Sequence, residues 1–248
     1  MAGLSGKTVV VTGASRGIGR ATALSLAREG AQIIVHYGRH AREAEQVVAE
    51  IRSLGSRAEK VNADLSAPDG PHKLAKRAKE IIGGRLDILV ANAGIFVPTA
   101  IENLTVEEFD RLFAVNVRAP LFLVQQLRSI MCTDSNVIFI SSLAARSPIG
   151  DGAAYAATKG ALETLVKYLA SALGSHDIRV NAVAPGIVET ETSSFVRTDE
   201  GREQALSMQS MKRIGRPEDV ARVVTFLASN EARWITGEVV RADGGSRL

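Results

Sequence analysis

Short apolar runs, mostly of β-branched residues, alternate with stretches of helical spacing along nearly the whole chain. This alternation constrains the fold more than any other feature. The run TVVVTG (8–13) ends at a glycine, and a stretch with apolar residues on one helical face (17–30) follows it. Such a change of period predicts a buried strand followed by a helix. Further strands are predicted at 31–37, 57–65, 86–94, 136–142, 178–186 and 237–245, and further helices at 41–55, 71–82, 106–131, 153–173 and 217–229.

Strands that take turns with helices pair in parallel, because each crossover returns the chain to the same edge of the sheet. We therefore predict an α/β fold with one doubly wound parallel sheet of about seven strands and helices on both faces. No linker, repeat or low-complexity segment is visible, so residues 1–248 are predicted to form a single domain. The least regular part, 186–215, is rich in Thr, Ser, Glu and Gly, and we predict a mobile substrate-binding loop there.

Composition argues against several classes of protein. Hydrophobic residues make up 46% of the chain and charged residues 23%, which is typical of a globular protein with a substantial core. The net charge of +3 comes from basic residues interspersed with acidic ones, so a nucleic-acid partner is not expected. Cys132 is the only cysteine, which excludes a cysteine-based metal site, and no metal is expected. With no apolar run of membrane-span length and no evident signal peptide, we expect a cytoplasmic location.

The segment TGASRGIG (12–19) joins the first strand to the first helix. Ligands of doubly wound sheets bind beyond the carboxyl ends of the strands, where this segment lies. Glycine allows unusual dihedral angles and close approach of a phosphate, and the following helix terminus favours a pyrophosphate. The spacing is G-x3-G-x-G, whereas G-x-G-x-x-G is the commoner pattern. Candidate cofactor contacts in this segment are Gly13, Ser15, Arg16, Gly17, Ile18 and Gly19.

The end of the second strand bears on the choice of cofactor. Tyr37 stands where an NAD-preferring site usually carries a carboxylate, and Arg39 and His40 follow it. Because guanidinium groups bind phosphate through paired charged hydrogen bonds, Arg16 and Arg39 favour NADPH over NADH. The alternative is that Arg39 only opens an amphipathic helix.

Polar residues follow the third and fourth strands as well. Asp64 and Leu65 end the third predicted strand, where they could contact an adenine, although Asp64 could equally cap a helix. After the fourth strand, Asn92 could tie two strand ends together, and Ala93 and Gly94 come next.

Tyr155 and Lys159 belong to the sequence YAATK (155–159) and lie on one face of a predicted helix. Taken alone, such a pair is more often an ordinary helix-surface contact. However, Ser142 ends the fifth strand shortly before it, so all three residues face the ligand-binding edge. Asn116 lies within the long helix between Val115 and Val117, and it is either a kink, a buried hydrogen-bonding hub or an exposed residue.

These motifs, in this order, resemble the short-chain dehydrogenase/reductase (SDR) family. The resemblance extends from Thr8 to Gly245 and includes TGASRGIG, NAG, Asn116, Ser142, YAATK, APG and the stretch from GRPEDVA to RADGG. It implies a Rossmann-like fold, a nicotinamide cofactor, a homotetramer and a catalytic tetrad of Asn116, Ser142, Tyr155 and Lys159. The cofactor contacts that it adds are Tyr155, Lys159, Pro185, Gly186, Val188 and Thr190.

The family's chemistry suits these residue types. Hydride transfer between a nicotinamide and a carbonyl or secondary alcohol needs hydrogen-bond donors at the oxygen and a proton donor or acceptor. The resemblance gives Ser142 the first role and Tyr155 the second. It also implies that Lys159 lowers the pKa of Tyr155 and binds the nicotinamide ribose, and that Asn116 holds a water.

Other functions remain open at this point. A 3-oxoacyl-[acyl-carrier-protein] reductase is the nearest alternative, although no basic cluster for an acidic carrier is visible. A non-catalytic NADPH-binding sensor or scaffold is the alternative from another class. HYGRH (36–40) resembles pteridine reductases, but those carry an acid where this chain has Ser142. The substrate is an unidentified small carbonyl or alcohol, and its expected pocket comprises Ile95, Phe96, Leu143, Ala144, Gly186, Phe195, Met208 and Met211.

Overall fold

The computed structural model describes residues 3–148 and 150–246, and the centre of this part is a seven-stranded parallel sheet. The strands are β1 (Thr8–Val11), β2 (Gln32–Tyr37), β3 (Ala58–Asn62), β4 (Leu86–Ala91), β5 (Met131–Ile140), β6 (Arg179–Pro185) and β7 (Val239–Ala242). They lie in the order β3-β2-β1-β4-β5-β6-β7, and each neighbouring pair is parallel. The order reverses between β1 and β4, which opens a crevice beyond their carboxyl ends. The predicted doubly wound sheet is confirmed.

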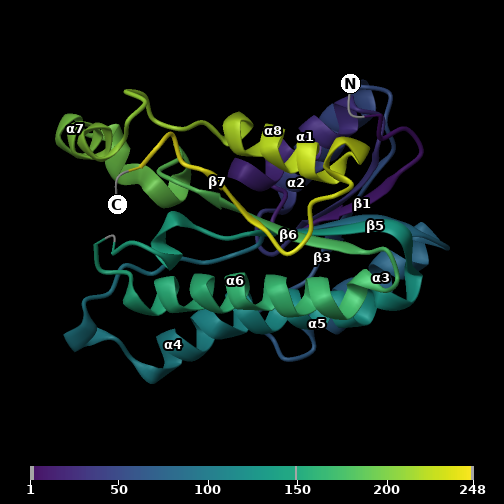
Figure 1. Ribbon diagram of the computed structural model, residues 1–248, viewed down its shortest axis with the longest axis horizontal. Coiled ribbons are helices and arrows are strands. Elements are labelled where there is room, and N and C mark those ends of the chain that lie inside the picture. The colour runs from purple at the N-terminus through teal and green to yellow at the C-terminus, as the bar shows by residue number, and fades with distance from the viewer. Residues whose placement is uncertain (1–2, 149, 247–248) are drawn as a thin grey trace.

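Helices cover both faces of the sheet (Figure 1). One face carries α1 (Gly17–Arg28), α2 (Ala41–Ser53) and α8 (Pro217–Ala228). The other face carries α3 (Gly70–Ile82), α4 (Val106–Phe113), α5 (Ala119–Leu127) and α6 (Ala153–Gly174). Short helical turns are η1 (Ile101–Asn103), η3 (Arg128–Ile130), η4 (Leu143–Ala145) and η6 (Asn230–Ala232).

The sheet separates two apolar cores, because successive residues of a strand point to opposite faces. Val9 and Val11 of β1 pack into the core beneath α1, α2 and α8, whereas Val10 packs into the core beneath α3, α5 and α6. Both faces are therefore buried, which explains why the strands read as continuous apolar runs. Burying each such side chain contributes about 1.5–3 kcal/mol relative to leaving it in water.

The helical stretch predicted at 106–131 contains an irregularity around Asn116. A π-helical segment, η2 (Ala114–Arg118), joins α4 to α5. Asn116 is 1% exposed within it, so the side chain is enclosed between the helix and the protein interior. Of the alternatives that the sequence left open for Asn116, the structure excludes an exposed residue and shows a buried polar residue at a helix irregularity.

The segment 186–215 is more ordered in form than a loop. It contains η5 (Glu191–Arg197) and α7 (Asp199–Met208). The hydroxyl of Thr198 accepts a 3.2 Å hydrogen bond from the Gly201 amide and caps α7. Four buried residues give the segment a small core of its own, separate from the two cores at the sheet: Ile187, Val196, Ala205 and Ile214. Part of the predicted loop is therefore helical, because few but well-placed apolar residues suffice to pack these short helices. Its mobility and its contact with substrate stay predictions.

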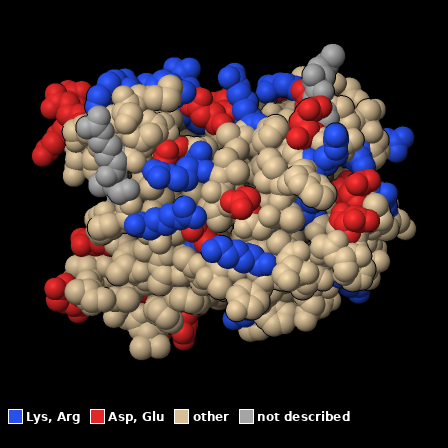
Figure 2. Space-filling view, viewed as in Figure 1, with Lys and Arg blue, Asp and Glu red and all other residues tan. Residues whose placement is uncertain are grey.

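Charged side chains of both signs are interspersed on the face that Figure 2 shows. Among the described residues, Arg213–Asp219 and Arg241–Asp243 are examples of ion pairs between such side chains. Within the described ranges, no helix combines the length and apolar character that a bilayer crossing requires.

Candidate active site

A cavity of about 1230 Å³ lies beyond the carboxyl ends of β1 to β6. An ordinary small-molecule site measures roughly 300–1,000 Å³, so this cavity has room for a cofactor and a substrate together. Most residues predicted for the site line it. They are Gly13, Ser15, Arg16, Gly17, Ile18, Gly19, Arg39, His40, Asp64, Leu65, Asn92, Ala93, Gly94, Ser142, Tyr155, Lys159, Pro185, Gly186, Val188 and Thr190. The predicted substrate-side residues Ile95, Phe96, Leu143, Ala144 and Phe195 line it as well.

Several predicted residues lie outside the cavity wall. Tyr37 packs its ring against the core beneath α1 and α2, because its neighbour His36 takes the opposite side of the strand and faces the cavity. Met208 packs against the small core of the 186–215 segment, and Met211 is 54% exposed. Asn116 lies behind the wall. Tyr37, Met208 and Met211 are therefore not among the residues that line the cavity.

The glycine-rich turn brings the start of α1 close to β4. Gly13 has a φ of +63°, a conformation that side-chain-bearing residues rarely adopt, and a Cβ there would lie 3.0 Å from Cα of Ala93. A Cβ on Gly19 would collide with the carbonyl oxygen of Gly13. Arg16, which precedes α1, makes no side-chain capping bond, so the positive end of the helix is available to a phosphate.

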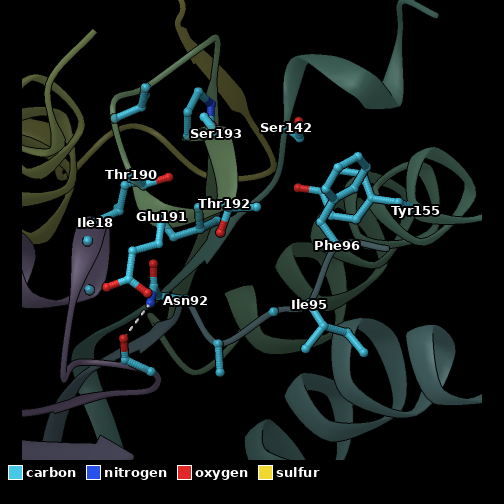
Figure 3. Close-up of a pocket in the computed structure, with 18 of the residues that line it drawn as sticks. Ile18, Asn92, Ile95, Phe96, Ser142, Tyr155, Thr190, Glu191, Thr192 and Ser193 are labelled. Carbon is cyan, nitrogen blue, oxygen red and sulfur yellow. Dashed lines mark hydrogen bonds between the residues drawn. The ribbon is translucent and has the colours of Figure 1, made fainter. Parts of the chain in front are cut away.

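Asn92 ties the ends of β1 and β4 together, as its position in the sequence predicted. Its Nδ2 donates hydrogen bonds to the carbonyl oxygens of Thr12 at 2.8 Å and Gly13 at 3.1 Å. In return, the hydroxyl of Thr12 accepts bonds of 2.9 Å from the amides of Asn92 and Ala93. The close-up in Figure 3 shows Asn92 at the floor of the cavity.

Asp64 forms a local turn and faces the cavity. Its Oδ1 accepts hydrogen bonds from the Ser66 amide at 2.9 Å and the Ser66 hydroxyl at 2.7 Å. These bonds are the main cause of its lowered pKa, with a smaller contribution from the positive charge of Arg39. Asp69, not Asp64, precedes α3, so the alternative of Asp64 as a helix cap is wrong.

Arg16 forms an ion pair with Glu191, which sequence reasoning did not anticipate. Glu191 begins η5 and extends its carboxylate into the cavity between Ile18 and Asn92 (Figure 3). The pair connects the glycine-rich turn to the segment that covers the cavity. A phosphate that binds Arg16 must therefore compete with this carboxylate.

Tyr155 and Ser142 approach each other across the cavity (Figure 3). Burial raises the pKa of the Tyr155 hydroxyl above its usual value, and its hydrogen bond with Ser142 opposes the rise. Ser142 Oγ accepts a 3.1 Å hydrogen bond from the Ala144 amide, which leaves the Ser142 proton free to be donated. The ring of Phe96 packs edge-on against Tyr155, with 5.1 Å between ring centroids.

Lys159 is buried one helical turn beyond Tyr155. Its Nζ donates a 2.7 Å hydrogen bond to the carbonyl oxygen of Ile140 and lies 5.5 Å from the centroid of the Tyr155 ring. Burial lowers the pKa of its ammonium to about 8. The ammonium is directed at the carbonyl oxygen of Ile140, and burial is the largest influence on the pKa of Tyr155. The lowering of that pKa by Lys159 stays a prediction.

Asn116 joins three parts of the chain behind the cavity. Its Oδ1 accepts from the Ile95 amide, and its Nδ2 donates to the Ile95 carbonyl oxygen, both at 2.9 Å. Nδ2 also donates to the hydroxyl of Thr158 at 3.1 Å. The amide thus connects the loop after β4 to α6, which carries Tyr155.

Sequence reasoning missed two polar residues near the site. His36 is 2% exposed and lines the cavity from β2, and the available signal was a polar residue in an otherwise apolar strand. Glu163 accepts hydrogen bonds from Ser141 at 3.0 Å and Arg146 at 2.9 Å, and so holds the segment beside Ser142 to α6. Its position one turn beyond Lys159, on the same helical face, was the available signal.

Together these features define a nicotinamide-dependent oxidoreductase. The cavity lies at the reversal of strand order, a glycine-rich turn leads into an uncapped helix terminus, and serine, tyrosine and lysine side chains meet on the far wall.

Comparisons with known proteins agree with this class. A family model described as Enoyl-(Acyl carrier protein) reductase matches residues 13–247. Versicolorin reductase stcU of Emericella nidulans is 40% identical over 98% of this chain and 96% of its own length. Trihydroxynaphthalene reductase of Colletotrichum orbiculare is 38% identical over 99% of this chain and 91% of its own. The crystal structure of the angucycline C-6 ketoreductase LanV with bound NADP is 42% identical, with a TM-score of 0.93 over 99% of this chain and 97% of that chain.

These matches show that the chain belongs to the family of short-chain dehydrogenase/reductases. It is an NADPH-dependent oxidoreductase that transfers a hydride between the nicotinamide and a carbonyl or secondary alcohol. The residues of the cavity fit the cofactor: glycines leave room beside the turn, and Arg16 and Arg39 supply positive charge at its rim.

Proposed function

We propose that Tyr155 is the proton donor in reduction and that Ser142 hydrogen-bonds the substrate oxygen. The supporting observation is the position of the two hydroxyls, which face each other in the cavity with the Ser142 proton free to donate (Figure 3). Tyr155 is protonated at neutral pH, because the usual pKa of a tyrosine is about 10 and burial raises it further, so the hydroxyl carries the proton that an acid must donate. In the oxidation direction the ionised Tyr155 oxygen accepts the proton of the substrate alcohol.

Lys159 and Asn116 complete the proposed tetrad. With its pKa near 8, Lys159 is mostly charged at neutral pH and stabilises the tyrosinate that forms during proton transfer. Its ammonium would also bind the nicotinamide ribose beside Tyr155. Asn116 holds α6 against the loop after β4 and so acts through the position of Tyr155. The bound cofactor supplies the hydride.

The proposed preference is for NADPH over NADH. Arg16 and Arg39 lie at the rim where the adenosine end of a dinucleotide binds, and the end of β2 directs no carboxylate into the cavity. The carboxylates nearby are already partnered, Glu191 by Arg16 and Asp64 by Ser66. The proposed cofactor contacts are the cavity-lining residues predicted above, without Tyr37.

The proposed substrate is a ketone carried on a fused aromatic ring system. The relatives act on versicolorin, on trihydroxynaphthalene and, as a C-6 ketoreductase, on an angucycline, according to their names. In this chain, the edge-on Phe96 and Tyr155 rings form an aromatic wall next to the reacting hydroxyl, and Phe195 lines the same cavity. Flat aromatic substrates pack well against such walls.

The remaining proposals concern the whole molecule. We propose a homotetramer of single-domain subunits that works in the cytoplasm, where NADPH is supplied. Large apolar side chains that remain exposed, namely Tyr168 on α6, Phe226 on α8 and Trp234, which is 97% exposed, support assembly with further copies. We also propose that the 186–215 segment moves as substrate and cofactor bind, since its buried apolar residues form only a small separate core.

NADPH oxidation with a panel of carbonyl compounds tests the substrate proposal. Fused-ring aromatic ketones should be reduced with a higher kcat/KM than simple alkyl ketones and than 3-oxoacyl thioesters of pantetheine or carrier protein. A preference for the thioesters would instead support an acyl reductase. Absence of turnover with every carbonyl, together with tight NADPH binding, would support the non-catalytic alternative.

A further inference from the structure

His36 is the one strongly buried histidine in the cavity wall, among the residues that the structure describes. It follows Ile33, Ile34 and Val35 in β2 and is 2% exposed. A buried polar side chain costs free energy unless its hydrogen-bonding atoms are satisfied, so its partners indicate what it does.

Both ring nitrogens of His36 are engaged, and the partners fix the tautomer. The Gly13 amide donates a 3.1 Å hydrogen bond to Nδ1, which must therefore be unprotonated. Nε2 lies 3.1 Å from the carbonyl oxygen of Ala63, which can only accept, so Nε2 carries the proton. Burial lowers the pKa of the ring to about 4, which agrees with a neutral side chain at physiological pH.

The same residue also holds the next amide of the turn. The Ala14 amide donates a 2.8 Å hydrogen bond to the carbonyl oxygen of His36. The carbonyl oxygen of Gly13 accepts from Asn92 on the other side. The peptide groups around Gly13 are thus held from β2 and from β4 at once, in the left-handed conformation that φ of +63° represents.

We propose that His36 is a positioning residue for cofactor binding. Because it occupies the amides of Gly13 and Ala14, those groups cannot contact a phosphate, and the diphosphate of the cofactor is left to the amides at the start of α1. His36 fixes the direction in which that helix terminus faces the cavity. The proposal rests on the nicotinamide cofactor and not on the roles assigned to Ser142, Tyr155 and Lys159.

Three variants separate the two ring contacts. His36→Asn places an amide oxygen near the position of Nδ1 and retains an acceptor for the Gly13 amide. His36→Gln places an amide nitrogen near the position of Nε2 and retains only the donor for Ala63. His36→Leu removes both contacts while keeping an apolar volume. Asn181→Leu is the matched control, because Asn181 is also buried in a strand and also bridges two backbone groups, Ile235 and Glu238, outside the cavity.

The measurement is the dissociation constant for NADPH and for NADH by fluorescence titration, on proteins whose fold is verified by circular dichroism. His36→Leu and His36→Gln should weaken the binding of both cofactors in parallel by about tenfold, as expected for loss of the buried hydrogen bond from the Gly13 amide. His36→Asn retains the acceptor for the Gly13 amide, so its dissociation constants should stay within about threefold of the wild-type values. At saturating NADPH, kcat should change little in all three. Asn181→Leu should lower Tm without altering either dissociation constant.

The outcomes decide between positioning and a merely structural role. If His36→Leu lowers Tm but leaves cofactor affinity unchanged, or if the Asn and Gln variants bind equally, the proposal is wrong. If His36→Leu does not fold, the Asn and Gln comparison still decides. A change in the ratio of NADPH to NADH affinity would also contradict it, because the diphosphate is common to both cofactors. That ratio separately tests the proposed NADPH preference.

Discussion

Thr158 accepts a 3.1 Å hydrogen bond from Asn116 and donates a 2.6 Å hydrogen bond to the carbonyl oxygen of Tyr155. Thr158 is fully buried, so one hydroxyl links the π-helical segment to the turn of α6 that carries the tyrosine. The threonine of YAATK is therefore part of the support for the site and not a spacer between Tyr155 and Lys159.

Replacing Thr158 with valine keeps the shape of the side chain and removes the link. We expect kcat to fall about fivefold to tenfold, because the tyrosine hydroxyl loses its fixed position. Stability should fall by about 1 kcal/mol for the lost hydrogen bonds. Thr158→Ser should restore both values, and NADPH affinity should be unaffected in either variant. Steady-state kinetics and urea unfolding check this, and a Thr158→Val enzyme with normal kcat would contradict the link.

Tyr155→Phe removes only the proposed acid. We expect kcat for reduction to fall about a hundredfold or more, as is usual for a lost general acid. The fold and NADPH affinity should persist, since the ring still packs against Phe96. Lys159→Ala should reduce both kcat and cofactor affinity, and the losses in the double variant should be much less than additive because the two residues act as a unit. Near-normal turnover by Tyr155→Phe would remove Tyr155 from the mechanism.

The Arg16–Glu191 pair predicts a direct effect on cofactor choice. Glu191→Gln should release Arg16 and tighten NADPH binding about twofold to fivefold, a modest change because both side chains are largely exposed. Arg16→Ala should weaken the binding of NADPH more than the binding of NADH. Titration of each variant with both cofactors provides the measurement. Glu189→Gln, in the same segment, is the control and should bind as the wild type does, and weaker NADPH binding by Glu191→Gln would show that the carboxylate does not compete.

Burial of His36 predicts a specific loss of stability in mild acid. In the unfolded chain this histidine takes up a proton near pH 6.5, whereas the folded protein resists protonation until about pH 4. Between these values the unfolded state binds more protons, so stability falls as the pH decreases and then levels off below the folded pKa. The total loss from this group is about 3 kcal/mol.

Urea unfolding of the wild type and of His36→Asn between pH 7 and pH 4 isolates this contribution. Asparagine does not titrate, so the stability of the variant should decline less steeply over that window. Parallel curves for the two proteins would mean that His36 is not kept neutral by the fold.

Hydrogen exchange tests the proposed motion of 186–215. Amides of η5 and α7 should exchange faster than those of β1 and β4, because the small core around Val196 and Ala205 holds few residues. NADPH with a substrate should slow their exchange. Slow exchange in the protein alone, equal to that of the central strands, would show a fixed cover.

Sequence periodicity predicted the sheet well because both faces of each strand are buried. The predicted strand at 86–94 ends in the structure at Ala91, since Asn92 leaves the ladder to bond with Thr12 and Gly13. Such ends are set by contacts with residues far along the chain, which periodicity does not register.

Other features of the site could not be predicted for the same reason. Arg16 and Glu191 are distant in sequence, and nothing local indicates that they pair. Tyr37 occupies the expected position along β2, but the direction of its side chain depends on which residue of the strand faces the cavity. The helices η5 and α7 went unrecognised because their polar composition conceals the few apolar residues that pack them.

The independent packing of Ile187, Val196, Ala205 and Ile214 has a consequence for how such enzymes diversify. The segment 186–215 packs mainly on its own small core and only slightly on the two large cores. Substitutions within it should therefore destabilise the sheet only slightly. A chimera that carries the corresponding stretch of a homologue should inherit the donor's choice of ketone while the recipient's hydride-transfer apparatus is unchanged. Evolution can therefore change substrate specificity through the segment 186–215 without changing the residues that carry out hydride transfer.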